Sequence, residues 1–132
     1  MNNSQKKILQ ISFITIFMIL FIVHWVNNIK EKKEVRLKNE TTIGWLIEYD
    51  DGGADFSAKS VIYSYEVLGE IYSREVNVTV GFKKCENFDE CKDKRYWVIY
   101  SPDSPEKSLI NLEIEIQGVE NPEFPESLDG FK

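Results

Sequence analysis

The sequence predicts an all-β domain, a small antiparallel five-stranded barrel or sandwich, that follows one N-terminal transmembrane helix. Three observations lead to this fold class. Residues 8–29 contain no charged side chain and are mostly apolar. Five later segments are rich in β-branched and aromatic residues, and most of them alternate with a period of two. Turn residues separate these segments, and no amphipathic helical pattern lies between them.

The apolar segment, residues 8–29, is long enough as a helix to cross a hydrocarbon layer of about 30 Å. A cleaved signal has a shorter apolar region and a small-residue cleavage site, which this segment lacks. Trp25 suits the headgroup level, and Lys30 marks the return to water. We therefore expect an uncleaved anchor that contacts the lipid bilayer. The hydroxyls of Ser12 and Thr15 can pair with another helix, but we favour bonds back to their own helix.

The segments that flank the anchor and the β domain are polar. Residues 1–7 form a short N-terminal tail. Residues 30–40 form a charged stalk, whose first part can extend the membrane helix for two turns. We favour a solvated stalk over a site for anionic lipid headgroups, because interleaved glutamates weaken the basic field. Residues 41–117 are expected to form the β domain, and residues 118–132 a loosely ordered acidic tail.

The charge of the soluble part limits its partners. Residues 39–132 contain nine basic and twenty acidic residues, which gives a net charge of −11. Nucleic-acid-binding proteins present basic patches, whereas this strongly acidic part should repel nucleic acid. We therefore expect no nucleic acid among the partners.

Five strands are predicted, over residues 41–49, 61–68, 71–80, 96–100 and 108–117. The fourth is apolar on both faces and is expected to be central. Gly69 supplies the turn between the second and third strands. Arg74 lies on the apolar face of the third strand, with its head expected in water near a sheet end. The predicted core consists of Trp45, Ile47, Tyr63, Tyr65, Val67, Val76, Val78, Val98, Tyr100, Leu112 and Ile114.

Two motifs resemble a known family. The hairpin reads Val61-x-Tyr63-x-Tyr65-x-Val67-x-Gly69-x-x-Tyr72, and the later segment reads Trp97-Val-Ile-Tyr-Ser-Pro-Asp-Ser-Pro-Glu-Lys-Ser-Leu109. Together they resemble the bacterial domain of unknown function 3592, over roughly residues 42–116. The chain departs from the commoner pattern in its Cys-containing connection and in having one span. The resemblance implies a membrane-anchored small β domain and no catalytic residue.

The sequence offers no catalytic, cofactor or metal site. The only histidine, His24, lies in or at the edge of the span, so the soluble part has no histidine to activate a nucleophile. Two cysteines fall short of a zinc site. Asp50, Asp51 and Asp55 lack the spacing of a calcium loop and are interpreted as a solvated turn. We therefore expect no enzyme and no cofactor.

The two cysteines bear on the side of the membrane. Cys85 and Cys91 lie in one connection between strands, where a short loop can bring them to disulfide distance. Two free thiols remain the alternative. The positive-inside rule favours a cytoplasmic domain, because five basic residues follow the span within nine positions and two precede it. The short N-terminal tail, the family resemblance and a disulfide favour an extracytoplasmic domain, which we expect.

Two functions are compatible with these features. The first is a membrane-anchored extracytoplasmic binding or assembly module that contacts a partner protein or a polymer of the envelope. The second is a small accessory subunit that acts through its transmembrane helix, residues 8–29. Replacing the span with an unrelated one distinguishes them.

Overall fold

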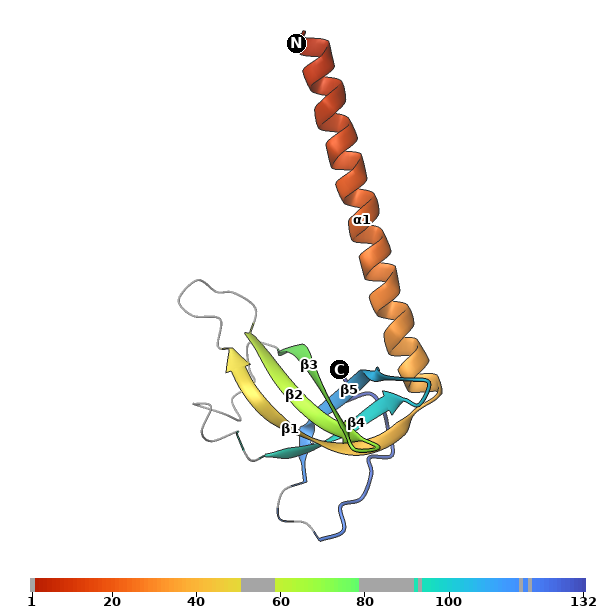
Figure 1. The fold of residues 1–132 in the computed structure, drawn as a ribbon, viewed down its shortest axis with the longest axis vertical. Helices are drawn as coiled ribbons and strands as arrows, with labels where there is room; N and C mark the ends of the chain where they lie inside the picture. Colours follow the sequence, from red (N-terminus) through yellow and green to blue (C-terminus); the bar gives the residue numbers. More distant parts are fainter. Residues whose placement is uncertain (1, 51–58, 79–91, 93, 117, 119) are drawn as a thin grey trace. The chain divides into compact units, whose positions relative to one another are not determined.

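The structure is a computed structural model that describes residues 2–50, 59–78, 92, 94–116, 118 and 120–132 (Figure 1). The chain divides into two units, Met1–Lys33 and Glu34–Lys132.

The first unit consists of the helix α1, which spans Asn3–Leu37 and whose last turn belongs to the second unit. The helix contains no glycine or proline, so no residue interrupts its hydrogen-bond ladder. The Thr15 hydroxyl donates to the Ile11 carbonyl at 2.9 Å, which confirms the predicted bond back to the helix. The helix continues to Leu37, as the charge pattern after the span predicts. It is long and apolar enough to cross a membrane.

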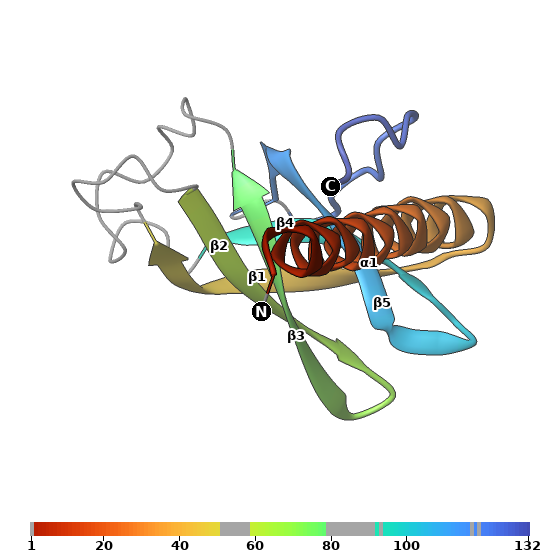
Figure 2. The same ribbon diagram turned by 90° about the horizontal axis from the view of Figure 1, so that it is seen from above.

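The second unit contains one antiparallel sheet, which confirms the predicted fold class. Its strands are β1 (Glu40–Asp50), β2 (Lys59–Val67), β3 (Glu70–Val78), β4 (Arg95–Ser101) and β5 (Ser104–Glu115). Their order across the sheet is β3-β2-β1-β4-β5, so β1 pairs with β2 on one side and with β4 on the other. The sheet curls into a half-barrel, and its two edge strands, β3 and β5, contact each other (Figures 1 and 2).

Two short turns join the hairpins. Leu68 and Gly69 connect β2 to β3 with φ angles of 52° and 87°. Two consecutive positive φ angles match the right-handed twist of the flanking strands, which is why Gly69 suits this place. Pro102 and Asp103 form the turn between β4 and β5, as predicted from the proline. The predicted central place of β4 is confirmed, since it lies between β1 and β5.

The inner face of the curled sheet forms the main core. At Gly44 of β1 a Cβ atom would lie 2.7 Å from Val98 Cγ2 and 2.9 Å from the Ser64 carbonyl oxygen, so only glycine allows this approach. The buried residues of the core come from all five strands. They are Leu46, Val61, Tyr63, Tyr65, Val67, Val78, Tyr96, Val98, Tyr100, Ile110 and Leu112.

Three residues of the predicted core lie elsewhere. Gly44 and Leu46 face inward, so Trp45 lies half-buried on the outer face. A bulge between Leu46 and Glu48 then leaves Ile47 42% exposed. Irregular pairing between β4 and β5 leaves Ile114 45% exposed. Val76 is partly buried and packs against the core. The other predicted core residues are buried as expected.

A second cluster covers the outer face over β4 and β5. Its buried members are Val35 of the last helical turn, Ile99, Leu109 and Phe131. The predicted stalk is therefore not solvated throughout, because Val35 is fully buried. Arg36 also donates to the Phe131 carbonyl at 2.9 Å.

The end of the predicted loose tail is also part of this unit. Phe131 forms an isolated β-bridge with Asn111. The amide of Lys132 donates to the Ile110 carbonyl at 3.0 Å, and the Ile110 amide donates to the Lys132 carbonyl at 3.1 Å. The last residues therefore pair with β5, and burial of Phe131 accounts for this.

Candidate binding surface

The inner face of the sheet is closed by contacts that cross from β2 and β3 to β5. The hydroxyls of Tyr63 and Ser108 lie 2.8 Å apart, and the Tyr65 hydroxyl donates to the Pro105 carbonyl at 2.6 Å. Arg74 donates to the Ser108 carbonyl at 3.4 Å. The half-buried Arg74 therefore has a hydrogen-bond partner within the domain, which the sequence did not predict. These contacts make the inner face a packed core.

The tyrosines of this core form a stacked group around Tyr65. Tyr65 stacks on Tyr63, Tyr72 and Tyr100, with ring centroids 5.9, 5.8 and 6.5 Å apart. The Tyr100 hydroxyl donates to Glu40 at 2.7 Å. Burial, and then the hydrogen bond and charge of Glu40, raise the pKa of Tyr100 to about 12. Burial, assisted by the charge of Glu115, likewise raises the pKa of Tyr96 to about 12. Both phenols are therefore neutral near pH 7.

In the described part of the chain, the outer face carries exposed and half-buried side chains over β1, β2, β3 and the start of β4, with the buried Ser64 between them. We call this region the open outer face and define it by Ile43, Trp45, Glu66, Ile71 and Arg95. Cross-strand pairing places Ile71 opposite Glu66 and Trp45 opposite Arg95. Ile71 is 67% exposed and Ile43 is 36% exposed.

The β2–β3 turn adds a further exposed apolar side chain. Leu68 is 100% exposed and has the positive φ angle that residues other than glycine rarely adopt. Exposed branched side chains at a turn and along an edge strand provide contact area that packing inside the domain does not use.

A hollow of about 320 Å³ lies within the open outer face, lined by Trp45, Glu66, Lys92 and Arg95. The Arg95 guanidinium carbon lies 5.8 Å from the centroid of the Trp45 ring, a cation–π arrangement. The Thr42 hydroxyl donates to the Glu66 carbonyl at 3.1 Å, which ties β1 to β2 beside the hollow. An aromatic face, two cations and one carboxylate thus meet at one place.

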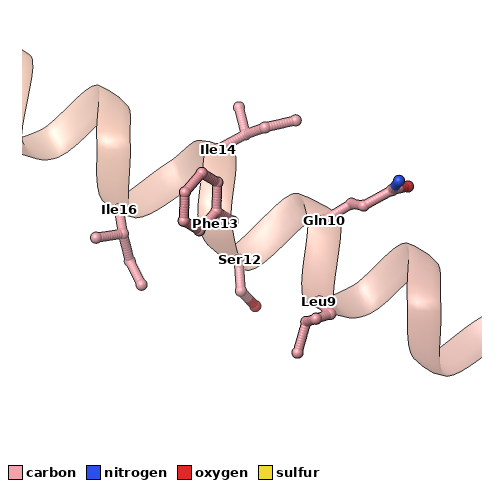
Figure 3. A pocket seen from close by; sticks show the side chains of 6 residues that line it. All are labelled: Leu9, Gln10, Ser12, Phe13, Ile14 and Ile16. Carbon is pink, nitrogen blue, oxygen red and sulfur yellow. The ribbon is translucent and has the colours of Figure 1, made fainter.

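The apolar helix surface is a different kind of feature (Figure 3). Leu9, Gln10, Ser12, Phe13, Ile14 and Ile16 border a space of about 830 Å³. All six side chains come from one helix, and Figure 3 shows Ile14 and Ile16 pointing in opposite directions. They enclose no cavity, and the surface suits the lipid chains or another helix.

The predicted disulfide residues, Cys85 and Cys91, lie outside the described residues, as do Asp51 and Asp55 of the predicted solvated turn. The described part of the chain brings together no group of three His, Cys, Asp or Glu side chains suited to a metal ion.

The hollow does not follow from the sequence, because the alternation in residues 41–49 predicts Trp45 in the core and Arg95 lies 50 positions further along the chain. A partial signal existed, because Gly44 and Leu46 allow the opposite phase of β1.

Comparisons of the chain with protein-family models, curated proteins and solved structures found no match. The resemblance to the domain of unknown function 3592 therefore stays a prediction. The fold itself defines a class. The chain has a helix long and apolar enough to span a membrane, followed by a half-barrel domain of five antiparallel strands.

Proposed function

We propose that this is a single-pass membrane protein whose β domain is an extracytoplasmic binding or assembly module. It contacts its partner, a protein or a polymer of the envelope, through the open outer face. One observation supports this most directly, the difference between the two sides of the sheet. The inner side is packed, and among the described residues the apolar cluster of the outer side lies over β4 and β5, while Ile43 and Ile71 on the same side are exposed.

The proposal includes no catalytic role. The single histidine of the chain, His24, lies within the apolar helix. Tyr96 and Tyr100 have raised pKa values and are poor proton donors or acceptors near neutral pH. Aromatic and aliphatic side chains on an open sheet face suit recognition better than chemistry.

The alternative is an accessory subunit that acts through α1. A photo-crosslinking amino acid placed at Ile71 and, in a second variant, at Phe13 separates the two roles. Both variants are made in the natural span and in one with residues 8–29 replaced by an unrelated apolar sequence. Crosslinks from Ile71 that survive the replacement support the binding module. Crosslinks from Phe13 alone, lost on replacement, contradict it and support the accessory subunit.

The extracytoplasmic location has its own test. A membrane-impermeant maleimide is applied to intact cells before and after reduction. We expect Cys85 and Cys91 to be labelled only after reduction of intact cells. Labelling without reduction contradicts the disulfide and keeps the location. Labelling that requires lysis but no reductant contradicts the location.

A further inference from the structure

The hollow on the open outer face concentrates positive charge on an acidic domain. Residues 39–132 contain nine basic and twenty acidic residues. In the described part of the chain, three other lysines pair with carboxylates: Lys38 with Asp103, Lys94 with Glu115 and Lys107 with Glu34. Lys92 and Arg95 line the hollow, and neither has a carboxylate within ion-pair distance among the described residues.

The indole of Trp45 forms the wall beside these cations. Trp45 is half-buried on the outer face, and the residue paired with it on the neighbouring strand β4 is Arg95. The guanidinium lies 5.8 Å from the ring centroid, so the ring helps to hold the planar donor group in place. The volume of about 320 Å³ lies at the small end of the range for ligand pockets.

Building on the proposed function, we propose that this hollow binds an anionic saccharide unit, a sugar ring bearing a carboxylate or a phosphate. The anion lies between Arg95 and Lys92, where guanidinium offers paired donors to two oxygens. The apolar face of the sugar ring lies on the Trp45 indole. Glu66 accepts hydrogen bonds from the sugar hydroxyls, as a carboxylate does well. Its negative charge would repel a polyanion.

The charge of the domain separates this ligand from nucleic acid. Duplex DNA carries one negative charge per ~1.7 Å of axis. Such a polymer meets Glu66 and the remaining acidic surface, with a net charge of −11 over residues 39–132. A single anionic unit needs only the local pair of cations, because salt screens charges beyond ~10 Å.

The test uses the full-length chain in a polyoxyethylene detergent, which contains no sugar to compete. The probes are glucuronic acid and glucose 6-phosphate, with glucose and inorganic phosphate as controls for ring and charge. Binding is followed by the indole N–H resonances of Trp45 and Trp97. Trp97 is the internal reference, because it also lies on the outer face but donates to the Glu123 carbonyl and packs edge-to-face against Phe124.

We expect saturable movement of the Trp45 resonance with both anionic sugars, at a Kd on the order of 1 mM for ligands of about 13 to 16 non-hydrogen atoms. Arg95→Gln should weaken binding by about tenfold or more, since a hydrogen bond to a charged group is lost. Lys92→Gln should weaken it by about threefold, as a single point charge is lost. Lys94→Gln is the matched control, because Lys94 pairs with Glu115, and it should change Kd by less than about twofold.

If glucose bound as tightly as the anionic sugars, the role of the anion would be overturned. If inorganic phosphate bound as tightly, the role of the sugar ring would be overturned. Absence of saturation, or tighter binding of adenosine monophosphate, would overturn the ligand class. Arg95 is exposed, so its variant is expected to fold, and the dispersion of the remaining resonances verifies this. Failure of the sugars while Ile71 crosslinks persist removes this inference alone. Loss of the Ile71 crosslinks removes the proposed function.

Discussion

The buried tyrosines differ in whether their hydroxyls have partners. The Tyr63 hydroxyl lies 2.8 Å from the Ser108 hydroxyl. The Tyr96 hydroxyl is buried and has no hydrogen-bond partner among the described residues. An unpaired buried hydroxyl costs the free energy of its lost hydration, whereas a paired one recovers it.

Removing the two hydroxyls should therefore have opposite effects. We expect Tyr96→Phe to raise the free energy of unfolding by about 1 kcal/mol, because it removes an unpaired polar atom. Tyr63→Phe should lower it by about 1–2 kcal/mol, because Ser108 loses its partner. Urea unfolding of the full chain in micelles, followed by near-ultraviolet circular dichroism, measures both. A destabilising Tyr96→Phe would show that the hydroxyl is hydrogen-bonded.

The raised pKa values of Tyr96 and Tyr100 predict alkaline destabilisation. Their folded pKa values, about 12, exceed the ordinary value of 10.0. Between these values the unfolded chain loses phenolic protons that the folded chain keeps, so stability falls as pH rises. The contribution is complete below pH 10 and is lost through about pH 12. Urea titrations at several alkaline pH values test this, and a flat midpoint in this window contradicts it.

A variant of Tyr100 tests the same dependence of the urea midpoint on alkaline pH. Tyr100→Phe removes a titrating group with a raised pKa, so the midpoint should fall less steeply with pH than in the natural chain. Leu37→Ala is the control, because it removes an exposed side chain that does not titrate and should leave the slope unchanged. An unchanged slope in Tyr100→Phe would contradict the role of this phenol.

At the scale of elements, the last helical turn is part of the β domain. Val35 packs with Ile99, Leu109 and Phe131, and Glu34 pairs with Lys107 at 3.1 Å. The ion pair is partly exposed and contributes little to stability, so burial of Val35 accounts for most of the stabilisation by this turn. The turn therefore acts as a cover for the outer face over β4 and β5.

Two substitutions in this turn form a matched pair. Val35→Ala should lower the free energy of unfolding by about 2 kcal/mol, because a fully buried side chain is truncated. Leu37→Ala removes a side chain that is 76% exposed, and it should change stability by less than about 0.5 kcal/mol. Urea unfolding of the full chain in micelles compares them. Equal effects would mean that Val35 does not pack against the sheet.

For the whole molecule, the helix and the acidic domain predict how the chain partitions. We expect it to remain with membranes after carbonate extraction, and mass spectrometry to find no cleavage near Asn27. Phe17→Arg combined with Leu20→Arg should release the chain from the membrane, since each arginine costs about 3 kcal/mol of insertion free energy at the centre of a span. Release of the natural chain, or a mature terminus near Asn27, would contradict the anchor.

Much of the domain follows from local patterns in the sequence. Period-two alternation located four of the strands, and the apolar run at residues 96–100 located β4. The alternation also assigned Tyr63 and Tyr65 correctly to the buried face. The uncharged run of residues 8–29 indicated a helix long enough to span a membrane. Gly69 marked the hairpin turn. Each of these features depends on neighbouring residues along one segment, which is why composition and spacing suffice.

The sequence by itself thus determined the kind and order of the elements, while the tertiary structure decided which face each strand buries. In β1 both alternating sets contain apolar residues, so pairing with β2 and β4, and not hydrophobicity, turned Leu46 inward and Trp45 outward. Val35 and Phe131 are buried against a surface that β4 and β5 form together, which no single segment of the sequence contains. The hollow of Trp45, Glu66, Lys92 and Arg95 likewise depends on three strands lying together, because residues distant in sequence become neighbours only after pairing.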